Sequence, residues 1–141
     1  MPKELSMHLQ QMVTFLQEEF PQFQGEVCDV QPDFCLLRQP INATHLRPGG
    51  TVSGPTLMAL ADVALYVALL AKIGPVALAA TTDFTIHFLN KPQANQDLMA
   101  KAYLIKLGKR LAIGEVELYS AQTTRLVAKA VGTYSIPPAT N

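Results

Sequence analysis

The chain is poor in the residues that most often build covalent or metal-based scaffolds. Its 141 residues include no tryptophan, two cysteines and three histidines. The two cysteines, Cys28 and Cys35, cannot form the disulfide framework of a small secreted domain, so we interpret both as reduced thiols. No group of cysteines and histidines has zinc-ligand spacing, and the sequence therefore predicts neither a metal site nor a cofactor.

An excess of charge of either sign is also absent. Eleven lysines and arginines balance eleven aspartates and glutamates. Because a balanced chain creates no overall field that would favour nucleic acid or an anionic membrane, neither is an expected partner. Local clusters of basic residues remain compatible with this balance.

Long uninterrupted apolar runs are missing as well. The first twenty residues lack the continuous apolar segment of a signal peptide. The most apolar stretch, residues 54–71, contains Asp62 near its middle. A carboxylate at the centre of a lone membrane span is costly, so we interpret this stretch as a buried helix in a cytoplasmic protein that does not cross a membrane.

The elements that are present follow a simple order. Apolar residues recur at helical spacing up to Pro21, which predicts an amphipathic helix near the N-terminus. Short strands are expected at 26–30 and 34–38, and a loop at 40–53. The long helix should begin at Gly54, a permissible N-cap before Pro55, and end at Gly74-Pro75. Four strands are expected to follow, at 77–89, 97–106, 110–119 and 125–136.

This order predicts one α+β domain that spans residues 1–141. The long helix is apolar on every side, and such a helix has to be enclosed. An antiparallel sheet wrapped around one central helix is the simplest architecture that encloses it.

Asp62 is the strongest functional signal in the long helix. Between Arg47 and Lys72, the only other ionisable side chain is that of Tyr66. Because an unpaired buried carboxylate is unfavourable, Asp62 indicates catalysis, ligand binding or a structural hydrogen-bond network. Tyr66 lies one turn further on the same face, where it could hydrogen-bond the carboxylate. The residues alone leave the functional and the structural alternatives open.

The start of the same helix is a second candidate site. A helix N-terminus carries unpaired N–H groups and a partial positive charge, which together stabilise an oxyanion. Gly54 would let a ligand approach this backbone closely, although a tight turn would use the same residue. Thr51 and Pro55 replace the glycines of a nucleophile elbow around Ser53, so we interpret Ser53 as a loop or capping hydroxyl.

The strand expected around residues 81–88 alternates between polar and apolar residues. Its polar face consists of Thr81, Asp83, Thr85 and His87. We expect the apolar face to pack on the core and the polar face to point toward solvent or a subunit boundary. The polar face would become functional only if a partner subunit covers it.

Three basic residues, Lys106, Lys109 and Arg110, cluster at the expected hairpin between the next two strands. A soluble turn would account for them. The functional alternative is a mobile clamp for the phosphates of a nucleotide-like carrier such as coenzyme A.

These segments together resemble the hotdog-fold acyl-CoA thioesterases of the PaaI-like branch, in the 4-hydroxybenzoyl-CoA thioesterase superfamily. The run from His45 to Asp62 is similar to the family signature, H-x-N-x-x-G-x-x-H-G-G followed by a helix ending in L-x-D. Residues 79–89 look like the family's third strand, and residues 106–111 look like its fourth-to-fifth hairpin. The resemblance covers roughly residues 25–136 and implies a hotdog fold that hydrolyses acyl-CoA to free acid and coenzyme A.

The resemblance also implies roles for individual residues. It implies that Asp62 acts as nucleophile or general base, that Gly54 polarises the thioester carbonyl, and that Thr81 of a partner subunit assists the water. It further implies a homodimer or a tetramer built as a dimer of dimers, in which two sheets join edge to edge and each site uses both subunits.

The chain departs from the family signature in two places. Arg47 stands where the family has asparagine, and Ser53-Gly54-Pro55 replaces His-Gly-Gly. Because arginine cannot accept a hydrogen bond from water, we expect Arg47 to bind an anionic or oxygen-bearing part of the substrate. Ser53, Lys109 and Arg110 are the other residues that we expect to contact acyl-CoA.

Acyl-CoA hydrolysis is the function that these residues favour. A non-catalytic acyl-CoA-binding module is the alternative, but it has no obvious use for a buried Asp62. A hotdog dehydratase ranks last, because it needs a loop histidine and an acid one turn into the helix. His45 lies too far before Asp62, and Asp62 lies about two turns into the helix.

Overall fold

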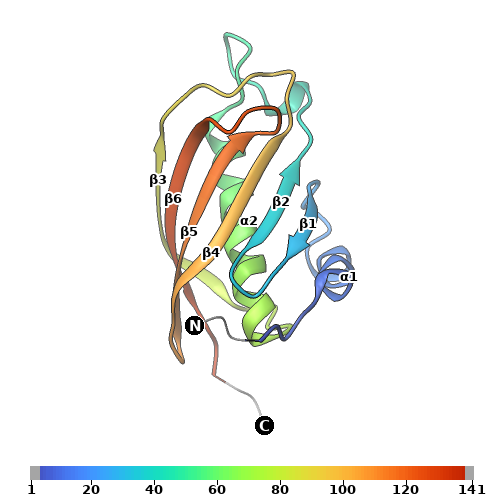
Figure 1. The fold of residues 1–141 in the computed structure, drawn as a ribbon, viewed down its shortest axis with the longest axis vertical. Coiled ribbons are helices and arrows are strands. Elements are labelled where there is room, and N and C mark those ends of the chain that lie inside the picture. The colour runs from blue at the N-terminus through green and yellow to red at the C-terminus, as the bar shows by residue number, and fades with distance from the viewer. Residues whose placement is uncertain (1–3, 139–141) are drawn as a thin grey trace.

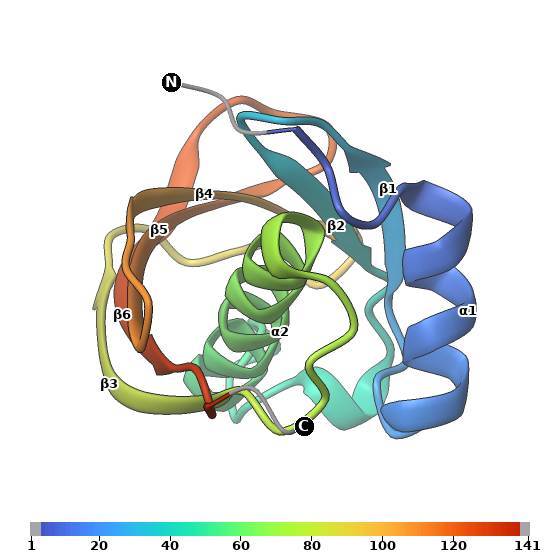
Figure 2. The same ribbon diagram turned by 90° about the horizontal axis from the view of Figure 1, so that it is seen from below.

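The computed structural model describes residues 4–138, and its elements follow the expected order (Figure 1). They are α1 (Leu9–Glu19), β1 (Glu26–Val30), β2 (Cys35–Gln39), the short 3-10 helix η1 (Ala43–His45), α2 (Gly54–Ile73), β3 (Ala80–Phe88), β4 (Leu98–Leu107), β5 (Leu111–Ser120) and β6 (Leu126–Ser135). The six strands form one antiparallel sheet in the order β1-β2-β4-β5-β6-β3. The sheet curves around α2, which confirms the predicted α+β hotdog architecture (Figure 2).

The concave side of the sheet packs against α2. Leu60, Leu65, Leu69 and Leu70 of the helix are at most 1% exposed. Opposite Leu65, Gly114 of β5 pairs with Gly132 of β6. A Cβ atom on either glycine would lie 2.5 or 2.7 Å from a methyl group of Leu65. The paired glycines therefore let α2 approach the sheet closely.

One side of α2 is left open by the sheet. Pro55, Met58 and Ala59 are exposed in the first two turns, and Asp62 is half-buried. Residues at these spacings lie on one helix face. The expectation that the helix is enclosed on every side is therefore wrong for this stripe, because the sheet wraps around only part of the circumference of α2.

By length and composition alone, α2 could cross a membrane. However, 67% of its most apolar window is buried inside the protein. This burial is typical of the core helix of a globular protein.

The two edges of the sheet differ. α1 packs beside β1 and buries Met12 and Leu16 (Figure 2). β3 forms the opposite edge, and within residues 4–138 it pairs only with β6. Most of its residues are exposed. β3 is thus a long edge strand with one side open to pairing.

Candidate active site

The carboxylate of Asp62 is held by hydroxyl groups from two strands. Thr81 Oγ1 of β3 donates to Asp62 Oδ1 over 2.6 Å. The Tyr134 hydroxyl of β6 lies 2.6 Å from the same oxygen. No hydrogen bond occupies Oδ2 within the described chain, residues 4–138. One carboxylate oxygen is therefore anchored, and the other is free to contact a ligand.

Tyr134, and not Tyr66, is the tyrosine partner of Asp62. The Tyr66 hydroxyl donates instead to the Ala77 carbonyl over 2.9 Å, so the Tyr66–Asp62 bond that the spacing allowed is not formed. Burial and then the hydrogen bond to Asp62 raise the pKa of Tyr134 well above its usual range. The phenol therefore stays protonated and acts as a donor. Local spacing could not have indicated it, because Tyr134 lies 72 residues after Asp62.

Thr81 lies on the helix side of β3, which corrects the predicted face. The pairing of β3 with β6 shifts register between Thr81 and Asp83. This irregularity interrupts the strand's alternation. As a result, Thr81 points toward α2, as do Phe84 and Ile86, which pack on the core. Thr81 thus contacts Asp62 of its own chain, whereas the resemblance implied a threonine from the partner.

The open stripe of α2 forms one wall of a groove of about 470 Å³ that contains Asp62. Phe20 and Phe23, from the connection between α1 and β1, lie in the same groove. Its polar lining includes Gln22, Gln24, Gln39, His45 and Ser53. The N-terminal segment therefore contributes to the site, which neither spacing nor the family motif had indicated.

The first turn of α2 is capped by Ser53, one residue before the predicted cap Gly54. Ser53 Oγ accepts from the Thr56 N–H over 3.3 Å, and the Ser53 carbonyl accepts from the Leu57 N–H. The interpretation of Ser53 as a capping hydroxyl is confirmed. Pro55 has no N–H. In the described part of the chain, the Gly54 N–H has no partner, so it is the open donor of this helix start.

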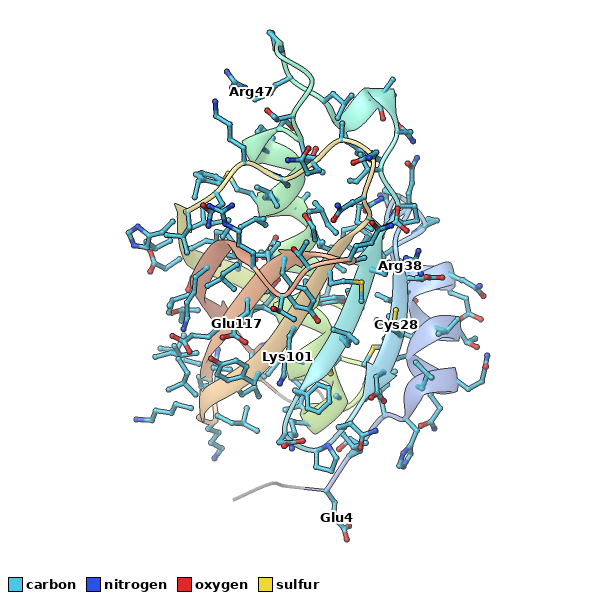
Figure 3. The ribbon with its side chains drawn as sticks, turned by 45° about the horizontal axis from the view of Figure 1, so that its top comes forward. Glu4, Cys28, Arg38, Arg47, Lys101 and Glu117 are labelled. Atoms are coloured by element: carbon cyan, nitrogen blue, oxygen red, sulfur yellow. The ribbon has the colours of Figure 1, made fainter. Side chains whose placement is uncertain are left out.

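Arg47 lies in a tight hairpin before α2, and Figure 3 shows it at the opposite end of the molecule from Glu4. The Arg47 N–H donates to the Thr51 carbonyl over 2.9 Å, and the Gly50 N–H donates to the Arg47 carbonyl over 3.0 Å. Gly49 and Gly50 have φ values of 99° and 80°, which only glycine adopts readily. The turn therefore fixes the place of Arg47 in the loop.

Arg47 and Gly54 line a different hollow from Asp62. This second hollow has a volume of about 630 Å³, and Phe88 and Lys91 also line it. A Cβ atom on Gly54 would lie 3.3 Å from the Phe88 ring. The candidate site residues of one chain therefore fall into two groups, one with Asp62 and Thr81 and one with Arg47 and Gly54, and the two groups line different hollows.

Lys109 and Arg110 lie at the tip of the β4–β5 hairpin, at the other end of the molecule from the start of α2 (Figure 1). Arg110 Nε donates to the Ile136 carbonyl over 3.0 Å. Within one chain, the hairpin is not brought together with Arg47. Its role as a phosphate clamp stays a prediction.

The cysteines lie outside these sites. Cys28 and Cys35 are free thiols, and burial raises the pKa of Cys35 to about 12. A thiol with such a pKa is unreactive at neutral pH. Among residues 4–138, no three side chains of His, Cys, Asp or Glu gather into a group that could hold a metal ion.

Comparison with known proteins identifies the family. A family model described as the thioesterase superfamily matches residues 49–127, more than half of the chain. The chain belongs to the thioesterase superfamily. The family model matches the segment that contains Gly54, Asp62 and Thr81, and the match ends before Tyr134.

Individual relatives of this thioesterase-superfamily protein agree with that assignment. A presumed esterase of Pseudomonas aeruginosa is 32% identical over 97 residues, 69% of this chain and 71% of the relative. A presumed thioesterase of Silicibacter sp. TM1040 is 41% identical, with a TM-score of 0.90 over 97% of this chain and 96% of that one. A variant of the phenylacetic acid degradation protein PaaI from Thermus thermophilus is 27% identical, with a TM-score of 0.72 over 88% and 99%. The resemblance to PaaI-like hotdog thioesterases is thereby confirmed.

Proposed function

We propose that this protein hydrolyses acyl-CoA thioesters to the free acid and coenzyme A, with Asp62 as nucleophile or general base. The observation that carries the proposal is the Asp62 carboxylate in a thioesterase-superfamily chain. Its Oδ1 is fixed by Thr81 and Tyr134, and its Oδ2 is free of protein partners among residues 4–138, beside a partly apolar groove. We also propose that the protein acts in the cytoplasm.

Two mechanisms use the same carboxylate oxygen. Oδ2 of Asp62 can attack the thioester carbon and displace coenzyme A as the thiolate, which leaves an acyl–Asp62 anhydride that water hydrolyses. Alternatively, Oδ2 takes a proton from a water that attacks the same carbon, and the C–S bond then breaks to give the free acid and the coenzyme A thiolate, which takes up a proton. In both routes the carbonyl oxygen becomes negatively charged. The unpartnered Gly54 N–H at the positive end of α2 is the donor that we assign to this oxyanion.

We further propose that a complete site combines partial sites from two protomers. Asp62 and Gly54 are separated by about 12 Å along α2 at 1.5 Å per residue, and they line different hollows. A second chain, joined at β3, would place the Arg47–Gly54 pair of one protomer opposite the Asp62–Thr81 pair of the other. In this arrangement, Asp62 and the Thr81 that contacts it belong to the same protomer.

The oligomer proposal predicts that the protein is a homodimer or a tetramer at micromolar concentration. β3 has an open edge, and Phe88 at its end and the adjoining Leu89 are 53% and 51% exposed. Pairing with a second chain would satisfy the open edge and cover these side chains. Sedimentation velocity measures the assembly directly. A monomer under these conditions would contradict both the oligomer and the shared site.

Arg47→Ala is expected to raise KM while leaving kcat almost unchanged. If the guanidinium binds a phosphate or carboxylate of the substrate, its loss should weaken binding by about 1.5–3 kcal/mol. A contact made equally in the ground state and the transition state affects KM rather than kcat. Steady-state kinetics on the best substrate tests this, with Arg47→Asn as a second variant.

Arg38→Ala is the matched control for lost positive charge. Arg38 is an exposed arginine on β2 that pairs with Asp97, so it should leave both constants unchanged (Figure 3). If kcat falls in Arg47→Ala while KM holds, Arg47 acts on the thioester or the attacking water. Unchanged kinetics in both Arg47 variants would remove it from the site.

A panel of acyl-CoA thioesters of varied chain length and aromatic character, followed by release of free thiol, tests the proposed function. Turnover that disappears in an Asp62 variant supports hydrolysis at this site. Binding of acyl-CoA without turnover across the panel would instead support the non-catalytic binding module. Neither binding nor turnover would overturn the proposal.

A further inference from the structure

We propose that Tyr134 is a positioning residue for the reaction. Its hydroxyl fixes Oδ1 of Asp62, a residue that lines the groove, and leaves Oδ2 without a protein partner within residues 4–138. The inference rests on the proposed thioester hydrolysis, but it concerns a residue outside the segment matched by the family model. The geometry of three elements, α2, β3 and β6, carries it.

The Tyr134 hydroxyl is close to two acceptors of Asp62. It lies 2.6 Å from Oδ1 and 2.7 Å from the main-chain carbonyl oxygen of the same residue. A phenol has a single hydrogen, and a carboxylate is the stronger acceptor. We therefore assign the hydrogen to Oδ1, with Thr81 Oγ1 as the second donor to that oxygen.

The ring of Tyr134 cannot easily move away from Asp62. Tyr134 is 5% exposed, and its neighbours across the sheet are Thr81 of β3 and Ala112 of β5. Its ring also packs against that of Tyr66, with centroids 6.2 Å apart. Tyr134 belongs to β6, which pairs with β5 on one side and β3 on the other. Its hydrogen bond therefore anchors the Asp62 carboxylate to the interior of the sheet. Thr81 alone would tie it only to the edge strand.

The loss of this hydroxyl should change catalysis more than binding. With a single donor left on Oδ1, the carboxylate can rotate and present Oδ2 in unproductive directions. Misplacement of a reacting group lowers the rate of the chemical step. Substrate contacts elsewhere in the groove would be unaffected. The consequence is a fall in kcat at nearly constant KM.

Neighbouring titratable side chains other than Tyr134 do not hydrogen-bond to the Asp62 carboxylate within residues 4–138. The other titratable groups nearby are Tyr66 on α2, Glu19 at the end of α1 and His45 in the loop before α2. The Tyr66 hydroxyl binds the Ala77 carbonyl, and His45 Nδ1 accepts from the Asn42 N–H. Glu19 is exposed. Within the described chain, Tyr134 is therefore the titratable residue that is hydrogen-bonded to the carboxylate.

The test compares Tyr134→Phe with Tyr66→Phe as matched control. Both variants remove one hydroxyl from a buried tyrosine of the same ring pair. We expect Tyr134→Phe to lower kcat about 10- to 100-fold, as for loss of a hydrogen bond to a charged group, with KM hardly changed. Tyr66→Phe should keep most of the wild-type kcat.

A further readout separates positioning from a general structural role. The ¹³C chemical shift of the Asp62 carboxyl, recorded without substrate at one fixed pH, should change in Tyr134→Phe, because this variant removes a hydrogen bond to Oδ1. It should keep the wild-type value in Tyr66→Phe, since the Tyr66 hydroxyl binds the Ala77 carbonyl instead. Equal kcat losses in the two variants, or a wild-type ¹³C shift of Asp62 in Tyr134→Phe, would overturn the inference.

The two proposals fail in distinguishable ways. If wild-type protein hydrolyses acyl-CoA, and Tyr134→Phe matches it in kcat and in the ¹³C chemical shift of Asp62, only the role of Tyr134 is wrong. If wild-type protein hydrolyses nothing in the panel, the proposed function is wrong. The ¹³C chemical shift of Asp62 then still decides whether Tyr134 contacts the Asp62 carboxylate.

Discussion

Asp62→Asn is expected to abolish thioester hydrolysis while the fold stays intact. The asparagine amide has nearly the same shape, and its oxygen can still accept hydrogen bonds from Thr81 and Tyr134. A neutral amide, however, is a poor base and a poor nucleophile. Loss of a general base alone costs about 10²–10⁴-fold in rate, and loss of a nucleophile removes the covalent route altogether.

The measurement is release of free thiol from the best acyl-CoA of the panel, with thermal unfolding recorded in parallel. Asp33→Asn is the control, because Asp33 is an exposed aspartate in the turn between β1 and β2. It should retain wild-type activity. An Asp62→Asn protein that remains active would exclude the catalytic assignment. A variant that no longer folds would indicate that Asp62 serves structure instead.

Leu65→Ala is expected to have the largest effect on stability among the substitutions considered. Leu65 is 1% exposed, and its two methyl groups lie against the paired glycines Gly114 and Gly132. Removal of a leucine side chain from such a packed site costs about 2–5 kcal/mol of unfolding free energy. The cavity should persist, because α2 is held at its distance by the rest of the core. Urea unfolding measures the loss.

A second substitution tests whether Gly114 and Gly132 are needed to make room for Leu65. A Cβ atom on Gly132 would lie 2.7 Å from a Leu65 methyl and 3.1 Å from the Phe84 ring. Gly132→Ala alone should therefore cost about 1–3 kcal/mol, the usual range for overpacking. In the Leu65→Ala background the same change should cost less, since the new methyl enters the vacated space. Additive losses would show that the helix–sheet contact is set by other residues.

The departures from the family signature bear on substrate rather than on fold. Arg47 sits in a hollow with Lys91 and Gly54, where two cations and an open N–H favour an anionic ligand. Pro55 removes one N–H from the helix start, and Ser53 caps the next available one. Within the first turn, Gly54 is therefore the one N–H left for the oxyanion role that we propose.

The elements of the fold could be predicted because their signals are local. The apolar stretch of α2, its start near Pro55 and its end at Gly74 are set by side-chain period, proline and glycine, and each of these signals depends only on neighbouring residues. Asp62 was visible in the same way, as a carboxylate in an apolar helix. Ser53, and not Gly54, became the cap, because the choice between adjacent capping residues depends on which side chain reaches an N–H.

Tertiary structure alone decided the surroundings of Asp62. The face of Thr81 depends on a register shift between β3 and β6, and a shift of one residue reverses the side of the sheet on which a side chain lies. Tyr134 reaches Asp62 only because β6 lies next to β3 in the sheet. The sequence by itself thus determined the helix, the order of the strands and the lone carboxylate. Strand pairing, which joins residues far apart in the chain, determined what holds that carboxylate and which side of α2 remains open.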